Sequence, residues 1–548
     1  MTHAFELTRR SLMAGFATLA VAAPALPGQA LAQSGTAAGQ GPGAPSSAIR
    51  GGRMVFGRYT DSQFLDPVTT ELNADIWVLT NLFDTLLSPS PDGKGLQPGL
   101  ATEWKWSDDR LALDLTLRPG VKFADGSDLT PADVAWSLDR ARGTGAWKDL
   151  IGSIAAIEPG EGRVTIRLSH PDATLLAALA TFNTGIMPRK LVEAAPGATV
   201  EDKMKSFAEK PVGSGPFVLV SWQRGQTMLL RRNPHHWRMA GDGKPLPYLD
   251  ELRFDIVPDD ATRLLKLKAG ELDGTEFVPY ARVRELQNDP SLRMELWPST
   301  RIRYIGLNCR PEYKGKKNPM ADARVRRAIN HAVNKDAIIA ITTQGLGKPM
   351  RSFMSSTTPL FSGPASGALY PYDLAKAKAL MTEAGYADGF EVSCQTVSGN
   401  QDDVNDLTAI QQMLAAIRIK VTIEQLDNAT KVARYRAGDF QLRTALWTND
   451  IADPAQIASY FAYYPNVENV RSGYRDPRLD ELYLASSKET DLEKRTAMYQ
   501  EIQKIYAEAA PILFLYETPY PVAFRRQATG FVQIPLGNNL FAEAAVQH

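Results

Sequence analysis

Residues 111–134 read LALDLTLRPGVKFADGSDLTPADV and place a strand, a turn and a helix start in close succession. Leucines at every second position from 111 to 117 alternate with smaller or polar residues, which is typical of a strand with one buried face. An Arg-Pro-Gly turn at 118–120 ends that strand. Thr130 is a suitable N-cap and Pro131 suits the first helical position, so we expect a helix over 128–142.

The same alternation of short strands and helices continues along the chain. Alternating apolar residues predict a strand over 164–168, and an unbroken apolar run predicts a buried strand over 512–516. Helices are expected over 322–333, over 373–384 and over 492–510, with Asp322 and Asp373 as N-caps, Gly385 as a stop and Pro511 after the last helix. The predicted fold class is α/β.

Composition excludes several classes of protein. The chain has 548 residues, with 44% hydrophobic residues, so it can bury a large core and has room for roughly three or four domains. Lys and Arg number 61, as do Asp and Glu, and this zero net charge argues against nucleic acid as a partner. Two cysteines are too few for a disulfide scaffold or a cysteine-rich metal site.

The first residues have the features of an export signal. A charged start with Arg9 and Arg10 precedes a weakly apolar run, and Ala30-Leu31-Ala32 matches a signal-peptidase site. We therefore expect an export signal peptide at 1–32, a flexible leader at 33–49 and a periplasmic protein. The adjacent arginines favour the twin-arginine route, although Leu12 departs from its pattern and general secretion stays open. The apolar run is too short for a membrane anchor.

The two cysteines leave two interpretations open. In an oxidising compartment Cys309 and Cys394 could form a disulfide, but they are 85 residues apart in the sequence (394 − 309). Two buried free thiols fit the sequence equally well.

Motifs for catalysis are missing. The sequence holds no H-E-x-x-H, G-x-S-x-G, P-loop or Rossmann fingerprint, so we expect a protein that is not an enzyme and needs no cofactor or metal. The pair His235-His236 is a poor chelate because adjacent side chains point in different directions. Gly213-Ser214-Gly215-Pro216 lacks the lysine of a phosphate loop and is expected to be a turn before a strand at 217–220.

Ten short motifs follow one another in a set order. They are LDP at 65–67, LFDTL at 82–86, PGLATEW at 98–104, LRPGVKFADG at 117–126, DV at 133–134, PVGSGPF at 211–217, RNP at 232–234 with Trp237, GELD at 270–273, VRRAI at 325–329 and AGY at 384–386. Together they make residues 50–545 resemble family 5 of the extracytoplasmic solute-binding proteins of ABC importers, the peptide, dipeptide and nickel group.

The resemblance implies an architecture. It is a two-lobe fold of the type II periplasmic-binding-protein class, with an extra third domain inserted in the first lobe. Carried onto this chain, lobe I takes 50–87, 212–302 and 516–548, the extra domain takes 88–211, and lobe II takes 303–515. Hinge closure of the lobes around a ligand would then follow.

One segment, WTNDIADP at 447–454, is similar to the family segment in which an aspartate pairs with the α-amino group of a bound peptide. The matching residue is Asp450, with Asn449 beside it, and Trp447 could add apolar or cation–π contact. A buried ammonium needs such a carboxylate partner. The alternative is that Asp450 caps the next helix and Trp447 is core.

Further ligand contacts are expected at three places. Glu71 and Asn73 lie in a segment at the offset of a cleft-lining loop in oligopeptide receptors, where Glu71 could face a basic group or the backbone could pair with a peptide strand. Arg301 and Arg303 lie at the proposed lobe junction and could hold an anionic ligand end or form salt bridges between lobes. Tyr304 is a pocket candidate.

The implied function is capture and delivery. The protein would bind a small solute, with a peptide or amino-acid conjugate favoured, and pass it to the permease subunits of an ABC transporter. It would be a monomer without a membrane anchor. The alternatives are a nickel complex, an opine or an oligosaccharide as ligand, or a ligand sensor in place of a transport component.

Overall fold

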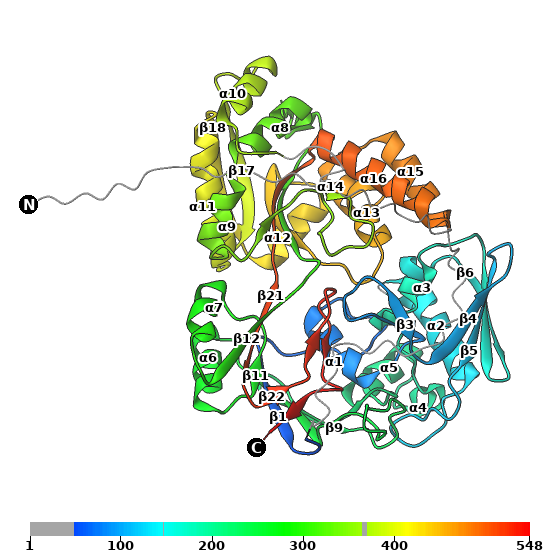
Figure 1. The fold of residues 1–548 in the computed structure, drawn as a ribbon. Coiled ribbons are helices and arrows are strands. Elements are labelled where there is room, and N and C mark those ends of the chain that lie inside the picture. Colours follow the sequence, from blue (N-terminus) through cyan, green and yellow to red (C-terminus); the bar gives the residue numbers. More distant parts are fainter. Residues whose placement is uncertain (1–48, 146, 364–369, 548) are drawn as a thin grey trace, which may run out of the picture. The chain divides into compact units, whose positions relative to one another are not determined.

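The computed structural model describes residues 49–145, 147–363 and 370–547. The predicted export signal at 1–32 and nearly all of the predicted leader lie outside the described residues. Three main sheets and their covering helices make up the described chain (Figure 1). The mixed α/β class expected from the sequence is therefore confirmed.

The first sheet has seven strands and gathers segments from both ends of the chain. Parallel pairing joins β1 to β10 and β11, whereas β21 runs antiparallel to β11 and β12. Phenylalanine rings pack on it, and Phe56 lies 5.8 Å from Phe531 and 5.1 Å from Phe541, centroid to centroid. Its strand order is β12 (Leu292–Trp297), β21 (Tyr520–Arg525), β11 (Gly274–Thr275), β1 (Arg53–Arg58), β10 (Glu251–Ile256), β9 (Thr227–Arg232) and β8 (Phe217–Gln223).

A four-stranded antiparallel sheet contains the strand that the sequence predicts at 111–117. Its order is β4 (Ala101–Trp106), β5 (Ala112–Leu117), β7 (Arg163–Leu168) and β6 (Ile154–Gly160). The predicted helix is α2 (Pro131–Thr144), and Thr130 caps it by accepting from the Asp133 N–H at 3.3 Å. The expected burial was wrong only for Leu111, which precedes the strand and is 36% exposed. Side chains of this sheet and of the seven-stranded sheet belong to one continuous core.

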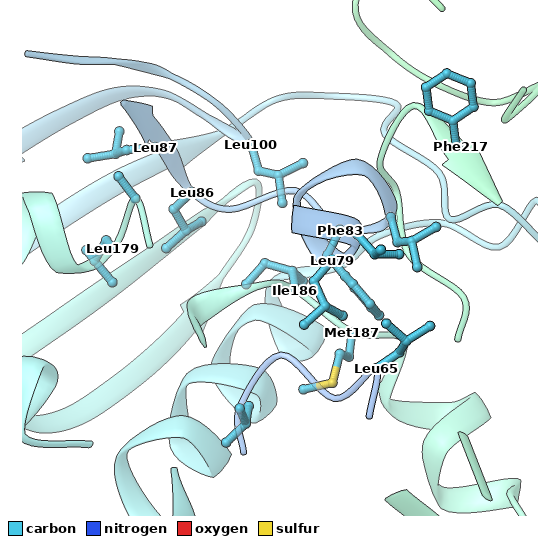
Figure 2. Packing of buried hydrophobic residues seen from close by; sticks show 14 of the residues in the cluster. Leu65, Leu79, Phe83, Leu86, Leu87, Leu100, Leu179, Ile186, Met187 and Phe217 are labelled. Carbon is cyan, nitrogen blue, oxygen red and sulfur yellow. The ribbon is translucent and has the colours of Figure 1, made fainter. Parts of the chain in front are cut away.

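Figure 2 shows part of that core at the end of α1 (Asn73–Leu82), where Leu79 and Phe83 lie beside Ile186 and Met187. The turn at 213–216 closes against the same helix end. The Gly215 N–H donates to Leu82 O at 3.0 Å, and a Cβ on Gly213 would lie 2.0 Å from that oxygen. Only glycine fits such a close approach, so the predicted turn before β8 is confirmed.

The third sheet has six strands and a separate core. Helix α11 packs along β17 and β18, as Figure 1 also shows. Every residue of the expected strand at 512–516 is buried, as predicted. The strand order is β16 (Lys348–Pro349), β20 (Ile512–Glu517), β13 (Ile302–Leu307), β19 (Leu442–Trp447), β17 (Phe390–Val397) and β18 (Ile419–Leu426). Helices in this part of the chain include α8 (Ala323–Ala332), α10 (Leu374–Glu383), α11 (Gln401–Ala415), α13 (Ala455–Ala462) and α16 (Leu492–Ala509).

Helix ends in this part follow the sequence signals. Asp322 accepts from the Arg324 N–H at 2.8 Å and Asp373 accepts from the Lys376 N–H at 2.9 Å, so both are the predicted N-caps. Gly385 has a φ of 81° and terminates α10 as expected. The remaining helices are α3 (Leu175–Ala178), α4 (Arg189–Ala194), α5 (Val200–Glu209), α6 (Asp260–Ala269), α7 (Tyr280–Gln287), α9 (Lys335–Thr342), α12 (Asn428–Arg436), α14 (Val467–Ser472) and α15 (Pro477–Lys488).

Two short segments link the seven-stranded sheet to the six-stranded sheet. Residues 298–301 join β12 to β13, and residues 518–519 join β20 to β21. The domain boundaries proposed from the sequence stay predictions, but these two passages define the region in which the candidate site lies.

Candidate functional site

The two linking segments are hydrogen-bonded to each other and to the loop that follows β19. The Thr518 N–H donates to Arg301 O at 3.3 Å, and the Asn449 N–H donates to Thr300 Oγ1 at 2.9 Å. The Thr300 N–H in turn donates to Pro535 O at 2.9 Å. We call this meeting of residues 298–301, 448–451 and 518–520 the junction.

Asp450 lies at the junction as a half-buried carboxylate. Its Oδ2 accepts from Gln456 Nε2 at 2.7 Å, and its own N–H donates to Gln456 Oε1 at 2.7 Å. Burial raises the pKa of Asp450 to about 6, and the Gln456 hydrogen bond only partly opposes this shift. No cationic side chain of the described residues pairs with it.

The alternative role of Asp450 as a helix cap does not match its contacts. Helix α13 follows the segment, and its N-cap position is Pro454, without a side-chain cap. The Ala455 N–H instead donates to Asp453 Oδ1 at 2.8 Å, so Asp453 is the side chain at the start of the helix. Arg495 fixes Asp453 with two hydrogen bonds of 2.7 Å. The Asp453 carboxylate is thus occupied by the helix N-terminus and by Arg495, whereas the Asp450 carboxylate takes part in neither contact.

Trp447 ends β19 and is half-buried on an aromatic support. Its ring lies 4.3 Å from the ring of Tyr460, centroid to centroid. The indole Nε1 donates to Asn449 Oδ1 at 2.8 Å. Asn449 is completely buried, and its Nδ2 donates to Thr358 Oγ1 at 3.2 Å. Asn449 therefore acts on the loop and on Trp447 as a positioning residue.

An aromatic cluster made by Tyr520 of β21, Trp77 of α1 and two residues that follow strands, Tyr59 and Phe277, borders the junction. Phe277 packs 6.2 Å from Tyr520, 4.7 Å from Tyr59 and 5.3 Å from Trp77, centroid to centroid. Its φ of 49° is unusual for a bulky residue and stores roughly 1–3 kcal/mol of strain. Arg301 Cζ lies 5.8 Å from the Phe277 ring centroid.

Tyr520 is a buried residue of the junction. Burial raises its pKa to about 12, the Arg301 guanidinium and the Thr448 hydroxyl oppose the shift, and the Asp450 carboxylate adds to it. Opposite charges on Arg301 and Asp450 therefore both act on the Tyr520 hydroxyl. Arg301 is itself half-buried and forms no ion pair with a described residue.

Arg303 and Tyr304 lie in the core of the six-stranded sheet, away from solvent. Arg303 pairs with Asp403 and lies 3.2 Å from Asp406 Oδ2. Both carboxylates belong to α11, which packs beside the same sheet. Tyr304 is 1% exposed and accepts from Arg443 Nη2 at 3.4 Å. Both faces of β13 are buried, which puts these two side chains among structural contacts. We leave both out of the proposed ligand contacts.

Glu71 and Asn73 are exposed at the start of α1. The preceding Thr70 is buried and fixes the segment, because its Oγ1 donates to Asp75 Oδ2 at 2.7 Å and its carbonyl accepts from Trp147 Nε1 at 3.0 Å. None of the contacts of this segment with described residues reaches the junction. The role of Glu71 and Asn73 as ligand contacts stays a prediction.

Cavities elsewhere do not involve the predicted site residues. Open surface hollows of 550, 220 and 470 Å³ lie beside Arg53, Lys335 and Asn318, respectively. Cys309 and Cys394 are free buried thiols, which matches the second of the two interpretations given above. Over residues 49–145, 147–363 and 370–547, no three His, Cys, Asp or Glu side chains are grouped to hold a metal ion. None of the helices in these ranges has the length and apolar character needed to cross a membrane.

A family model for bacterial extracellular solute-binding proteins, family 5 Middle, matches residues 95–469. The chain belongs to this family. The resemblance seen in the sequence motifs is therefore confirmed. Family 5 proteins are non-enzymatic substrate-binding components of ABC importers, so this chain is an ABC importer substrate-binding protein that takes a small solute or peptide.

Curated relatives of this family 5 protein differ in what their names say they bind. It is 30% identical over 499 residues to the probable D,D-dipeptide-binding periplasmic protein DdpA of Escherichia coli, with 89% of this chain and 93% of the relative covered. It is 27% identical over 493 residues to heme-binding protein A of Haemophilus influenzae, with 85% and 87% covered. Identity at this level does not single out one ligand.

Solved structures of family members superpose over nearly the whole chain. The periplasmic binding protein DppA from Helicobacter pylori, in complex with peptide STSA, has 26% identity and a TM-score of 0.77, covering 91% of this chain and 99% of that one. AgaA from A. tumefaciens, in complex with agropinic acid, has 26% identity and a TM-score of 0.73, with the same coverage. The predicted family fold is thereby confirmed.

Sequence reasoning missed three residues of the candidate site in this family 5 protein. Gln456 holds the Asp450 carboxylate, and Tyr520 and Phe277 form the aromatic side of the junction. Tyr520 had a usable signal, because it lies four residues after the predicted buried strand at 512–516, at the proposed return to lobe I. Phe277 and Gln456 had none, since only the tertiary fold brings them to the junction.

Proposed function

We propose that this binding protein captures a solute with a free amine, a peptide or an amino-acid conjugate, and delivers it to an ABC permease. The observation that carries the proposal is the state of Asp450, a half-buried carboxylate whose only side-chain partner among the described residues is a glutamine. A ligand ammonium would supply the missing positive charge. It would be held by a charge-assisted hydrogen bond in a place with little water.

Trp447 supports the same ligand class. Its ring is held by Asn449 and by Tyr460 at a position three residues before Asp450. An aromatic face near an ammonium adds cation–π attraction, and an aromatic face near a side chain adds apolar contact. The names of DdpA and of the DppA complex, which refer to a dipeptide and a peptide, agree with this class.

Delivery follows from differential affinity. We infer that the ligand joins the two sheets across the junction and so favours a closed arrangement, which the permease would recognise and open. Export through the signal at 1–32, by the twin-arginine route, would bring the protein to the periplasm. The ligand panel described next distinguishes this ligand class from nickel complexes, opines and oligosaccharides. An uptake assay then distinguishes a transport component from a ligand sensor.

The test is thermal unfolding with a ligand panel. Free dipeptides, their N-acetylated forms, opines, oligosaccharides and nickel chelates are added in turn, because a ligand that binds only the folded state raises the melting temperature. We expect a shift with free-amine compounds and none with their N-acetylated forms. Asp450→Asn should abolish the shift.

The matched control is Glu517→Gln. Glu517 is also a buried carboxylate with a raised pKa, but Ser356 fills its oxygens through N–H and hydroxyl hydrogen bonds. This variant should keep the ligand-induced shift. An equal response of Asp450→Asn and wild-type protein to the amine ligand would refute the proposed function. Uptake of the bound solute by a deletion strain would distinguish a transport component from a sensor.

A further inference from the structure

A hydrogen bond outside the junction joins the part of the chain with the four-stranded sheet to the part with the six-stranded sheet. The Ala173 N–H donates to Ser487 O at 2.8 Å. Ala173 lies in the loop 169–174 between β7 and α3, and Ser487 lies in the last turn of α15. Since β7 and α3 contribute to one hydrophobic core and α15 to the other, the bond links two separately packed parts of the molecule.

Asp172 fixes the shape of the loop from the side of the four-stranded sheet. Its Oδ1 accepts from the Thr174 N–H at 2.8 Å and from Thr174 Oγ1 at 2.7 Å. Its Oδ2 accepts from Ser153 Oγ at 2.7 Å, directly before β6. Residue 173 lies between the two bonded residues, so its N–H is positioned by bonds in which α15 takes no part. A loop that is already ordered loses little conformational freedom when it makes a contact.

Ser487 offers a carbonyl that its own helix does not use. The last carbonyls of an α-helix have no intrahelical donor, and α15 ends at Lys488. The neighbouring carbonyl of Ser486 accepts from Arg495 Nε at 3.0 Å, within the same part of the molecule. The carbonyl of Ser487 accepts instead from Ala173, so the cap of this helix end comes from the other part.

Arg495 connects the same helix end to the loop of the candidate site. Its Nη1 and Nη2 each donate to Asp453 at 2.7 Å, while its Nε holds the Ser486 carbonyl. Asp453 lies three residues after Asp450. The end of α15 is therefore tied to the Asp450 loop, and both would move as one body toward or away from Ala173 when the sheets close or open.

A second pair of side chains lies across the same boundary. Tyr483 of α15 packs its ring 4.8 Å from that of Tyr463, centroid to centroid. Burial raises the pKa of Tyr483 to about 12, and the carboxylates of Asp172 and Asp453 add to this shift. Asp172 of the loop is thus within electrostatic reach of α15, so more than one backbone bond relates the two segments.

We propose that the loop 169–174 is a latch, which bonds to the end of α15 when the two parts close and keeps the protein partly closed without ligand. This inference goes beyond the proposed function, because it depends neither on Asp450 nor on the identity of the solute. One backbone hydrogen bond of ordinary strength shifts such an equilibrium about two- to tenfold. Release of any solute would then include breaking the latch.

The test removes the donor of the latch. Ala173→Pro has no N–H at this position, whereas the matched control Ala173→Ser keeps it. Small-angle X-ray scattering of the unliganded proteins measures the radius of gyration, which grows when the two parts separate. We expect Ala173→Pro to be larger than wild type, through a shift of about two- to tenfold toward the open arrangement, and Ala173→Ser to match wild type. Circular dichroism shows whether each variant is folded.

A cysteine pair tests the same contact without removing the N–H. Ala173→Cys combined with Ser487→Cys should form a disulfide readily in the unliganded protein, because two bonded backbone positions lie close enough for one. The control pair is Ala173→Cys with Arg478→Cys, at the other end of α15 and about 13 Å further along the helix. The native Cys309 and Cys394 are buried free thiols and should stay reduced.

Each outcome decides for or against the latch. A folded Ala173→Pro variant with the radius of gyration of wild type would overturn the proposal. If that variant does not fold, the cysteine pairs decide. Disulfide formation that is no faster in the latch pair than in the control pair would then refute the contact, and selective formation in the latch pair would support it.

Discussion

The Asn449 N–H donates to Thr300 Oγ1 over 2.9 Å, so the loop that carries Asp450 is fastened to the segment that carries Arg301. One hydroxyl thus ties together the two segments that carry these side chains, neither of which has an ion-pair partner among the described residues. The relationship also links the six-stranded sheet to the passage between the sheets.

Thr300→Val should disturb that fastening while keeping the shape of the side chain. We expect the free energy of unfolding to fall by about 1–3 kcal/mol, because a buried N–H is left without an acceptor. Ligand affinity should fall as well, since the distance between the two charges is no longer held. Urea unfolding and calorimetry measure the two effects. Thr300→Ser, which keeps the hydroxyl, should restore both.

The affinity for an amine ligand should depend on pH through Asp450. The pKa of the unliganded carboxyl is raised to about 6, and a ligand ammonium stabilises the ionised form, so binding releases a proton below that pH. Affinity should therefore be constant above about pH 7 and fall about tenfold per pH unit well below pH 6. Calorimetry at several pH values tests this, and Asp450→Asn should bind weakly without that pH dependence.

Asp450→Asn should make the unliganded protein more stable at pH 7. Because the folded-state pKa is raised above the unfolded value, the carboxyl favours the folded state at low pH, and this contribution is lost as pH rises from about 4 to about 6. Asparagine carries no charge to bury, so we expect a gain of about 1–2 kcal/mol at pH 7 after allowing for partial exposure. A gain of the same size at pH 4 would contradict this origin.

Substitutions at Arg303 and at Arg301 should have very different effects on the free energy of unfolding. Arg303→Met leaves Asp403 and Asp406 without their buried cation, so unfolding should become easier by about 3–5 kcal/mol. Arg301→Gln removes no ion pair and should change the free energy of unfolding by less than about 1 kcal/mol. Urea unfolding of both variants without ligand is the measurement. A large loss of stability in Arg301→Gln would mean that its side chain has a structural partner.

The sequence predicted the helices and strands well where the stabilising contact is made by residues that are close together in the sequence. Thr130 caps α2 and Asp373 caps α10 through bonds to residues three positions away, which a sequence pattern contains. The burial of Leu111 was overestimated because the alternation extends one residue further than the strand does.

The site could be predicted only in part. The choice of Asp450 and Trp447 as ligand contacts rests on the resemblance of their segment to a family motif, and it stays a prediction. Arg303 and Tyr304 look in the sequence like residues next to a junction, but α11 covers Arg303 with Asp403 and Asp406, and that packing is tertiary. Whether an arginine is paired depends on residues some hundred positions away, so sequence alone left Arg301 and Arg303 equivalent.

The close approach of Gly213 to α1 affects how mutations in this protein would be interpreted in a genetic screen. A side chain there would meet the Leu82 carbonyl at 2.0 Å and force α1 apart from the start of β8, so almost any replacement should lower the amount of soluble protein. A screen that scores growth on the transported nutrient would list Gly213 together with Asp450. Immunoblots of periplasmic extracts would distinguish the two kinds of variant. Cells with a Gly213 replacement would contain little of the binding protein. Cells with an Asp450 replacement would contain the normal amount of a protein that does not bind its ligand.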